Sequence, residues 1–269
     1  MASLNNHMFT AFLSLALFLG LGFNVNISNA QQPDKKLHQQ CIYPIVLVSP
    51  DDANSFGTGF IVRSSKVENN LYCNVFFTCA HVVSESGHFE VKLYEYEDWS
   101  KIKSTKTFKA LITAKNPGSD IAVGMFLSEE PLPVVNLDFD PKLYIGNNVQ
   151  RVGCGMGDDP RLDRGHISSV KTDMGRLKGV IRTSIPTVPG DSGSPVFQKY
   201  KVIGLTQSIR AWKGFPVYHM SYVIPLDRFR VWDKELNGAI QYGWTKEAFP
   251  AIEMWQLKFY RNYDNSVFP

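Results

Sequence analysis

Short apolar stretches alternate with turn residues along most of the chain, and they are rich in β-branched and aromatic side chains. The stretches are residues 42–48, 59–62, 74–78, 89–94, 121–126, 149–153, 179–183, 195–197, 202–205 and 220–224. Many short strands without a long helical period are typical of an all-β barrel or sandwich. The Pro-rich segment from Pro131 to Pro141 is the best candidate for a linker within this series.

The pattern changes to helical spacing after Pro225. Apolar residues recur at Leu226, Phe229, Val231/Trp232 and Leu236, before Asn237-Gly238, which predicts a helix followed by a stop. The remaining residues are rich in aromatic side chains, and two interpretations stay open. The tail either packs back on a barrel or binds a partner.

The first thirty residues carry no Asp, Glu, Lys or Arg and contain an apolar run from Phe9 to Phe23. Such a run, ending in the small residues Ser28 and Ala30, predicts a secretory signal cleaved before Gln31, although no Lys or Arg precedes it. A membrane anchor is the alternative, but the run is shorter than the roughly 20 residues of a spanning helix. We therefore expect export to the periplasm or outside the cell, without stable membrane association after cleavage.

Composition adds two limits. The chain has 269 residues, 44% hydrophobic and 20% charged, which is ordinary for a globular protein and allows one large domain or two small barrels sharing a cleft. A net charge of +3 without a block of like charge predicts a slightly basic, solvated surface and no nucleic-acid partner.

The four cysteines are Cys41, Cys73, Cys79 and Cys154. Cys73 and Cys79 flank a stretch that reads as a strand, where they would be about 20 Å apart and beyond the reach of a disulfide. In an exported protein, Cys41 could form a disulfide with one of the other cysteines. Buried free thiols are equally compatible with the sequence.

Three motifs carry candidate chemistry. Residues 189–197 read Pro-Gly-Asp-Ser-Gly-Ser-Pro-Val-Phe, and they place Ser192 in a tight turn that leads into an apolar strand. Earlier in the chain stand Phe-Thr-Cys-Ala-His-Val-Val at 77–83 and Ser-Asp-Ile-Ala-Val at 119–123. The resulting order, His81, Asp120 and Ser192, is that of a nucleophilic catalytic triad.

A serine hydroxyl needs a base within hydrogen-bond reach to act as a nucleophile. His81 would take the proton and return it to the leaving amine, and Asp120 would fix the imidazole tautomer. The backbone N–H groups of Gly190 and Ser192 are the candidate oxyanion hole, and losing one such donor typically costs about 100- to 1000-fold in rate.

The chain resembles chymotrypsin-fold (trypsin-like) serine proteases, in particular the compact bacterial branch with HtrA-type and glutamyl endopeptidase-like enzymes. The matching segments are residues 57–62, 78–81, 120–123, 165–169, 189–197, 202–205 and 222–225. The resemblance implies two six-stranded antiparallel β-barrels, with His81 and Asp120 on the first and Ser192 on the second. It also implies a serine endopeptidase that acts on polypeptides through an acyl-enzyme, without cofactor or metal.

Four segments are therefore expected. They are a signal peptide at 1–30, an N-terminal barrel at 31–135, a C-terminal barrel at 142–225, and a helix with an aromatic-rich tail at 226–269. HtrA relatives usually carry Asn where Asp191 stands, and the roughly 30 residues after 238 are too few for a peptide-binding PDZ domain. The cysteine that extracellular trypsins carry after the histidine is replaced by Val82.

Asp191 raises a question of charge, because a carboxylate buried beside an oxyanion hole is costly unless it is paired. Trypsin pairs it with a new N-terminal ammonium, but this chain has no Arg-Ile-Val-Gly-Gly-like cleavage site. Gln31 would serve only if it does not cyclise. The hypothesis is that Arg151 pairs with Asp191, as in some bacterial relatives, which would make the protein active without zymogen cleavage.

By the same resemblance, the pocket for the residue before the scissile bond involves Pro186, Thr206, Ser208 and Tyr222. No acidic residue stands at its expected base, so the counter-charge for an Arg or Lys substrate is missing. The histidine that glutamyl endopeptidases carry nearby is replaced by Leu205-Thr206. A small or medium uncharged side chain is the expected preference.

Two rival functions are considered. A catalytically silent binding or regulatory protein on the same fold generally lacks a triad member, whereas this chain has all three. An esterase on an unrelated fold would have its nucleophile between a strand and a helix, with the histidine last in the chain. The remaining histidines show no spacing with cysteines or carboxylates that would predict a zinc site; they are His7, His38, His88, His166 and His219.

Overall fold

The computed structural model describes residues 34–50, 55–67, 71–83, 88–98, 101–174 and 177–235. The predicted signal segment at 1–30 and the aromatic-rich tail after Glu235 lie outside the described residues. In the part of the chain that is described, no helix combines the length and apolar character needed to cross a bilayer.

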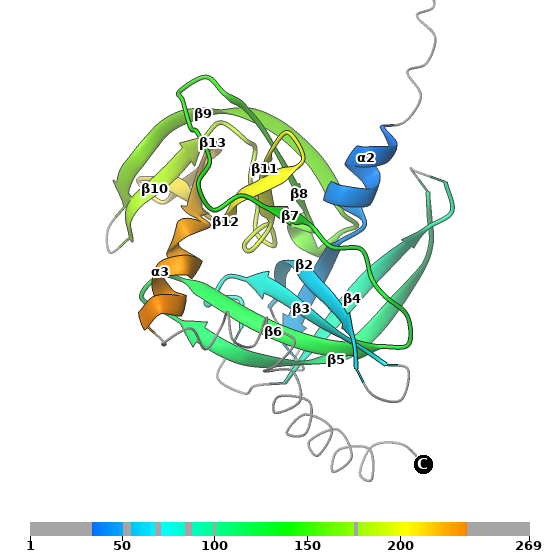
Figure 1. The fold of residues 1–269 in the computed structure, drawn as a ribbon. Helices are drawn as coiled ribbons and strands as arrows, with labels where there is room; N and C mark the ends of the chain where they lie inside the picture. Colours follow the sequence, from blue (N-terminus) through cyan, green and yellow to red (C-terminus); the bar gives the residue numbers. More distant parts are fainter. Residues whose placement is uncertain are drawn as a thin grey trace, which may run out of the picture. The chain divides into compact units, whose positions relative to one another are not determined.

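The first half of the described chain forms a closed antiparallel barrel of six strands (Figure 1). Around the barrel the order is β1-β2-β3-β6-β5-β4. The strands are β1 (Ile45–Pro50), β2 (Gly57–Lys66), β3 (Tyr72–Thr78), β4 (His88–Tyr96), β5 (Ile102–Asn116) and β6 (Ile121–Ser128).

The second half forms a second barrel in the order β11-β8-β9-β10-β13-β12, which closes because β11 also pairs with β12. The strands are β8 (Asn148–Gly153), β9 (Arg161–Met174), β10 (Leu177–Thr183), β11 (Pro195–Gln198), β12 (Lys201–Trp212) and β13 (Phe215–Pro225). The two-residue strand β7 (Asn136–Leu137), in the predicted linker, pairs in parallel with β12. The prediction of two six-stranded antiparallel barrels is confirmed.

The remaining elements are short. They are α2 (Lys35–Leu37), the π-helical turn η1 (His38–Ile42), the 3-10 turn η3 (Gly155–Gly157) and α3 (Asp227–Glu235). The strand expected from residue 42 begins only at Ile45, because residues 38–42 form η1, in which the Tyr43 N–H donates to the His38 carbonyl (2.9 Å). The predicted C-terminal helix is present as α3.

The helix α3 follows the second barrel but packs on the core of the first (Figure 1). The ring of Phe229 stacks on Phe77 of β3 with centroids 4.1 Å apart and planes 8° from parallel. Trp232, one turn further on, is also buried in this core. The first barrel is therefore completed by a residue that lies beyond the second barrel in the sequence.

All four cysteines are buried and none is part of a disulfide, which decides the open alternative in favour of thiols. Cys73 lies within the continuous strand β3, and Cys79 follows its end. Burial raises the pKa of the Cys41 and Cys154 thiols to about 12, so both are protonated near neutral pH.

Candidate active site

His81 and Asp120 lie at the same end of the antiparallel strand pair β3–β6 in the first barrel, where Thr78 stands opposite Ala122. His81 lies in the turn after β3, and Asp120 directly precedes β6, with a φ of +55° that aspartate tolerates better than most residues. The His81 N–H donates to Asp120 Oδ1 (2.9 Å), and His81 Nδ1 lies 2.8 Å from Asp120 Oδ2. Because the carboxylate holds both the backbone and the ring, the orientation of the imidazole is fixed.

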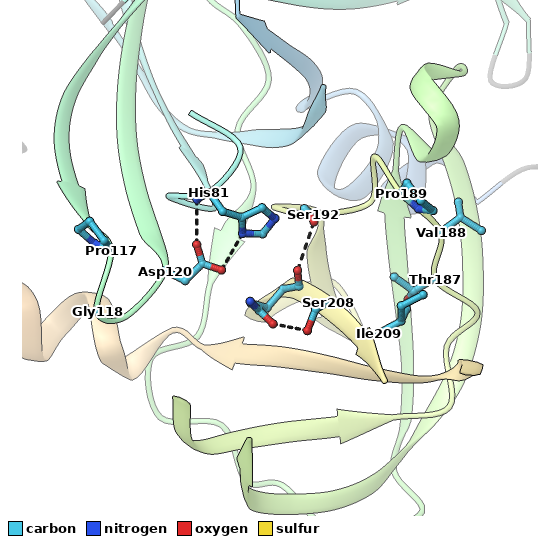
Figure 2. A pocket seen from close by; sticks show the side chains of 11 residues that line it. His81, Pro117, Gly118, Asp120, Thr187, Val188, Pro189, Ser192, Ser208 and Ile209 are labelled. Atoms are coloured by element: carbon cyan, nitrogen blue, oxygen red, sulfur yellow. Dashed lines mark hydrogen bonds and ion pairs between the residues drawn. The ribbon is translucent and has the colours of Figure 1, made fainter. Parts of the chain in front are cut away.

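Ser192 reaches the same cleft from the second barrel, and Figure 2 shows the His81 ring between Asp120 and Ser192. The structure thus brings together the three residues that the sequence singled out. The cleft encloses about 630 Å³. Ser192 Oγ donates to the carbonyl of Gln207 in β12 (3.2 Å), so this strand determines where the hydroxyl points.

Sequence reasoning missed the carbonyl of Gln207. On β13, Val223 lies opposite Thr206 and Tyr222 opposite Ser208, which leaves Gln207 as an extra residue in a β-bulge. A bulge takes a residue out of the regular ladder and re-aims its groups, which explains how this carbonyl meets the Ser192 hydroxyl. No pattern in the sequence marks such a bulge.

The turn of residues 189–192 is held by its own backbone carbonyls, each of which accepts a hydrogen bond. In chain order the donors are Met156 N (2.6 Å), Thr58 Oγ1 (2.8 Å), Ser194 N (3.0 Å) and Thr58 N (2.8 Å). Two of the four donors belong to Thr58 on the first barrel, a residue of the matching segment 57–62 for which no role was predicted.

These contacts determine where the N–H groups of the turn point. In a trans peptide the carbonyl and the N–H are directed oppositely, so the bond from Met156 to Pro189 turns the Gly190 N–H away from Met156. Gly190 has a φ of +93°, and a Cβ there would lie 2.7 Å from Phe56 and 2.8 Å from the Cys154 carbonyl. Among the described residues, neither the Gly190 nor the Ser192 N–H donates to a backbone acceptor.

Asp191 points away from the cleft into a fully buried ion pair. Arg151 Nη1 lies 2.7 Å from Asp191 Oδ2, and both side chains have no exposed surface. The same oxygen accepts from the Val188 N–H (2.8 Å), with Arg161 Nη2 at 3.6 Å. Burial raises the pKa of Asp191, while Arg151, the Val188 N–H and Arg161 act in the opposite direction.

Two further members of this charge cluster were not predicted. Arg151 Nη2 also binds Asp163, and Arg161 Nε lies 2.9 Å from the same Asp163 oxygen. In the β8–β9 hairpin Asp163 stands directly opposite Arg151, and Arg161 stands opposite Gly153. Two arginines and two carboxylates therefore balance each other beneath the turn. These contacts could have been predicted only from the register of the β8–β9 hairpin, which could not be derived from the sequence.

The walls of the cleft differ in part from the predicted substrate pocket. Ser208 lines the cleft, but Pro186, Thr206 and Tyr222 do not. Thr206 is buried; its N–H donates to the Ser194 carbonyl and its carbonyl accepts from the Gly193 N–H. Tyr222 packs against Val180. Besides His81, Asp120, Ser192 and Ser208, the lining residues are Pro117, Gly118, Thr187, Val188, Pro189, Gln207 and Ile209. Apart from the Asp120 carboxylate and the His81 imidazole, the residues that line the cleft have side chains that carry no ionisable group.

The one set of potential metal ligands found among the described residues includes two residues of the cleft, His81 and Asp120, and the buried Cys79. Donor atoms of Cys79, His81 and Asp120 lie within 4.8 Å of one another. The Cys79 thiol donates to the Thr206 carbonyl (3.3 Å), and His81 and Asp120 are bonded to each other. Burial and the charge of Asp120 raise the pKa of Cys79, so the thiol is protonated and a poor ligand.

The chain is similar in sequence to known peptidases. Residues 57–205, from β2 into β12, match the trypsin-like peptidase domain family. A probable periplasmic DegP-like serine endoprotease of Pseudomonas fluorescens is 26% identical over 198 residues, covering 72% of this chain and 38% of the relative. Its counterpart in Halomonas elongata is 27% identical over 199 residues, with the same coverage of each chain. The chain thus spans well under half the length of these relatives.

The structure is also similar to that of a serine endoprotease from Yersinia pestis. The TM-score is 0.57 at 17% identity, over 74% of this chain and 65% of the other. This similarity concerns the arrangement of the two barrels.

Proposed function

Because the chain belongs to the trypsin-like peptidase family, we propose that it is a serine endopeptidase with Ser192 as its nucleophile. The observation that carries the proposal is the meeting of His81, Asp120 and Ser192 in one cleft, beside the N–H groups of Gly190 and Ser192, which donate to no backbone acceptor in the described part of the chain.

The reaction would proceed in two halves. In the first, Ser192 Oγ leaves the Gln207 carbonyl, gives its proton to His81 Nε2 and attacks the substrate carbonyl. The oxyanion that forms is stabilised by the N–H groups of Gly190 and Ser192. His81 then protonates the leaving amine, and in the second half it activates the water that hydrolyses the acyl-enzyme. Asp120 holds His81 with its proton on Nδ1 throughout.

We further propose that the active conformation needs no cleavage of the chain. The role that a new N-terminal ammonium has in trypsin would be filled by Arg151, which lies 2.7 Å from Asp191 in the uncleaved chain. Arg161 and Asp163 complete the charge balance around this pair.

The substrate preference would be set by the uncharged walls of the cleft. Since the Asp120 carboxylate, which is bonded to His81, is the one acidic group among the residues that line the cleft, an arginine or lysine before the scissile bond finds no separate counter-charge. We expect a peptide library to be cleaved after small or medium uncharged residues. Preferential cleavage after basic or acidic residues would contradict this assignment.

Export is proposed as well. It is supported by the uncharged, apolar first thirty residues and by relatives named as periplasmic enzymes. Cleavage before Gln31 is the expected processing step, and the N-terminal sequence of the exported protein tests it.

A fluorophosphonate probe tests the enzymatic proposal directly. We expect the folded protein to gain one covalent adduct, located on Ser192 by peptide mass analysis, and Ser192→Ala to gain none. Ser194→Ala is the matched control, since this neighbouring hydroxyl is buried and should leave labelling intact. A folded wild-type protein without an adduct would instead favour a silent binding or regulatory protein on this fold.

A further inference from the structure

Thr58 connects the two barrels at the turn of residues 189–192, which we call the nucleophile turn. We propose that it is a positioning residue whose side-chain hydroxyl holds this turn in the conformation that presents the Gly190 and Ser192 N–H groups to an oxyanion. The proposal rests on the proposed function and extends it to a residue of the opposite barrel.

The contacts of Thr58 are complete and short. Thr58 is fully buried near the start of β2. Its N–H donates to the Ser192 carbonyl and its hydroxyl donates to the Gly190 carbonyl, both at 2.8 Å. The hydroxyl also accepts the Cys154 N–H (2.8 Å), and the Thr58 carbonyl accepts from Thr78 Oγ1 (2.8 Å).

The positions of these bonds within the turn give Thr58 its role. The two candidate oxyanion donors belong to the peptide planes 189–190 and 191–192, and Thr58 holds the planes 190–191 and 192–193 that alternate with them. Besides Thr58, plane 190–191 is held by the bond from the Asp191 N–H to the Val188 carbonyl (3.1 Å), from the segment just before the turn. Among the described residues, Thr58 is thus the contact that ties this plane to the first barrel.

The hydroxyl also supports the other side of the turn. By accepting the Cys154 N–H it fixes the start of the segment 154–156, and the Met156 N–H in that segment holds the Pro189 carbonyl. Removal of the hydroxyl would take away the hydrogen bonds that it makes to the Gly190 carbonyl and the Cys154 N–H, two buried backbone groups. Native proteins rarely tolerate such groups, and Gly190 has no Cβ to oppose rotation of its carbonyl toward solvent.

Such a rotation would displace the N–H of an adjacent plane. Oxyanion stabilisation requires donors about 2.7–3.1 Å from the developing charge, so a displaced turn slows the chemical step more than it weakens substrate binding. The signature of the proposed role is therefore a loss of kcat rather than a rise in KM.

Three variants test this role, with rates expressed per active site titrated by the fluorophosphonate. For Thr58→Val, which removes only the hydroxyl, we expect kcat to fall about 10- to 100-fold with KM within about 3-fold, a loss smaller than that of a whole oxyanion donor. Thr58→Ser should restore kcat to within about 3-fold of wild type. The control is Thr183→Val, a buried threonine whose hydroxyl bonds Ser221 (2.6 Å) outside the turn, and it should keep its kcat.

Crystal structures of the same variants give a readout that is independent of activity. The Gly190 carbonyl should be reoriented in Thr58→Val and unchanged in Thr58→Ser. If Thr58→Val does not fold, Thr58→Ala replaces it in both measurements. An unchanged turn, or a kcat equal to that of Thr183→Val, would overturn the role of Thr58 while leaving the peptidase proposal intact. Absence of labelling in the wild-type protein would overturn the peptidase proposal, and the turn conformation would still decide the role of Thr58.

Discussion

Replacement of Asp120 by asparagine is expected to lower kcat by about 10⁴-fold near neutral pH, with KM and stability changed much less. The carboxylate accepts two bonds from His81, one from the backbone N–H and one at Nδ1. An amide has a single acceptor oxygen, so if it keeps the backbone bond its NH₂ group faces Nδ1. The imidazole would then carry its proton on Nε2, where it cannot accept the proton of Ser192.

This result is checked by steady-state kinetics on a peptide substrate, together with thermal unfolding. Asp173→Asn is the matched control, because Asp173 is an exposed aspartate whose carboxylate pairs with Lys178 (3.4 Å) on the surface of the second barrel. It should retain the wild-type rate. An Asp120→Asn variant within about 10-fold of wild type would mean that this carboxylate does not set the tautomer of His81.

Replacement of Arg151 by methionine is expected to lower the free energy of unfolding by about 3–5 kcal/mol and to abolish most activity. The change leaves the fully buried carboxylate of Asp191 without the cation 2.7 Å away, and Arg161 at 3.6 Å is a weaker substitute. Asp191 is adjacent to Ser192, so movement of its side chain toward water would displace the nucleophile turn.

The double variant Arg151→Met/Asp191→Asn is the matched test of the pairing. It removes both charges, so most of the lost stability should return, whereas an independent structural role of Arg151 would leave the deficit unchanged. Urea unfolding of the wild type, both single variants and the double variant gives the coupling energy.

The pH dependence of the Arg151→Met deficit has a definite sign. Burial already raises the pKa of Asp191 above 3.8 in the folded protein, and loss of Arg151 would raise this pKa further. A carboxyl with a raised folded pKa contributes stability that is present below its unfolded pKa and lost as the pH rises through its folded pKa. The deficit relative to wild type should therefore be larger at pH about 8 than at about 4, and the reverse trend would contradict the ion-pair account.

The sequence was most informative where chemistry requires neighbouring residues. The motifs around His81, Asp120 and Ser192 are local, so their order indicated both the fold and the site. The proximity of Arg151 and Asp191 was anticipated from a general requirement, because a buried carboxylate needs a cation. Short apolar stretches bounded by turn residues likewise predicted an all-β barrel or sandwich, and strands such as β3 and β6 are indeed buried along nearly their whole length.

Features that depend on register or on long-range contacts could not be predicted. The strand β5 was missed because most of its side chains are exposed or half-buried, with lysines such as Lys106 and Lys109 paired to Glu95 and Glu90 across the sheet. Thr58 belongs to the matching segment 57–62, but its positioning contacts could not be predicted, because its partners on the second barrel lie more than 90 residues away in sequence. A bulge at Gln207 is equally invisible in residue identities.

The stack of Phe229 on Phe77 has a consequence for the order in which the molecule is made. The last strand of the first barrel ends at Ser128, yet an aromatic ring of its core is supplied only after the whole second barrel has been synthesised. A ribosome-bound chain that ends before residue 229 therefore holds an incompletely filled first barrel beneath β3, the strand that leads to His81. Peptidase activity would then arise late in biosynthesis, after nearly all of the described chain has emerged.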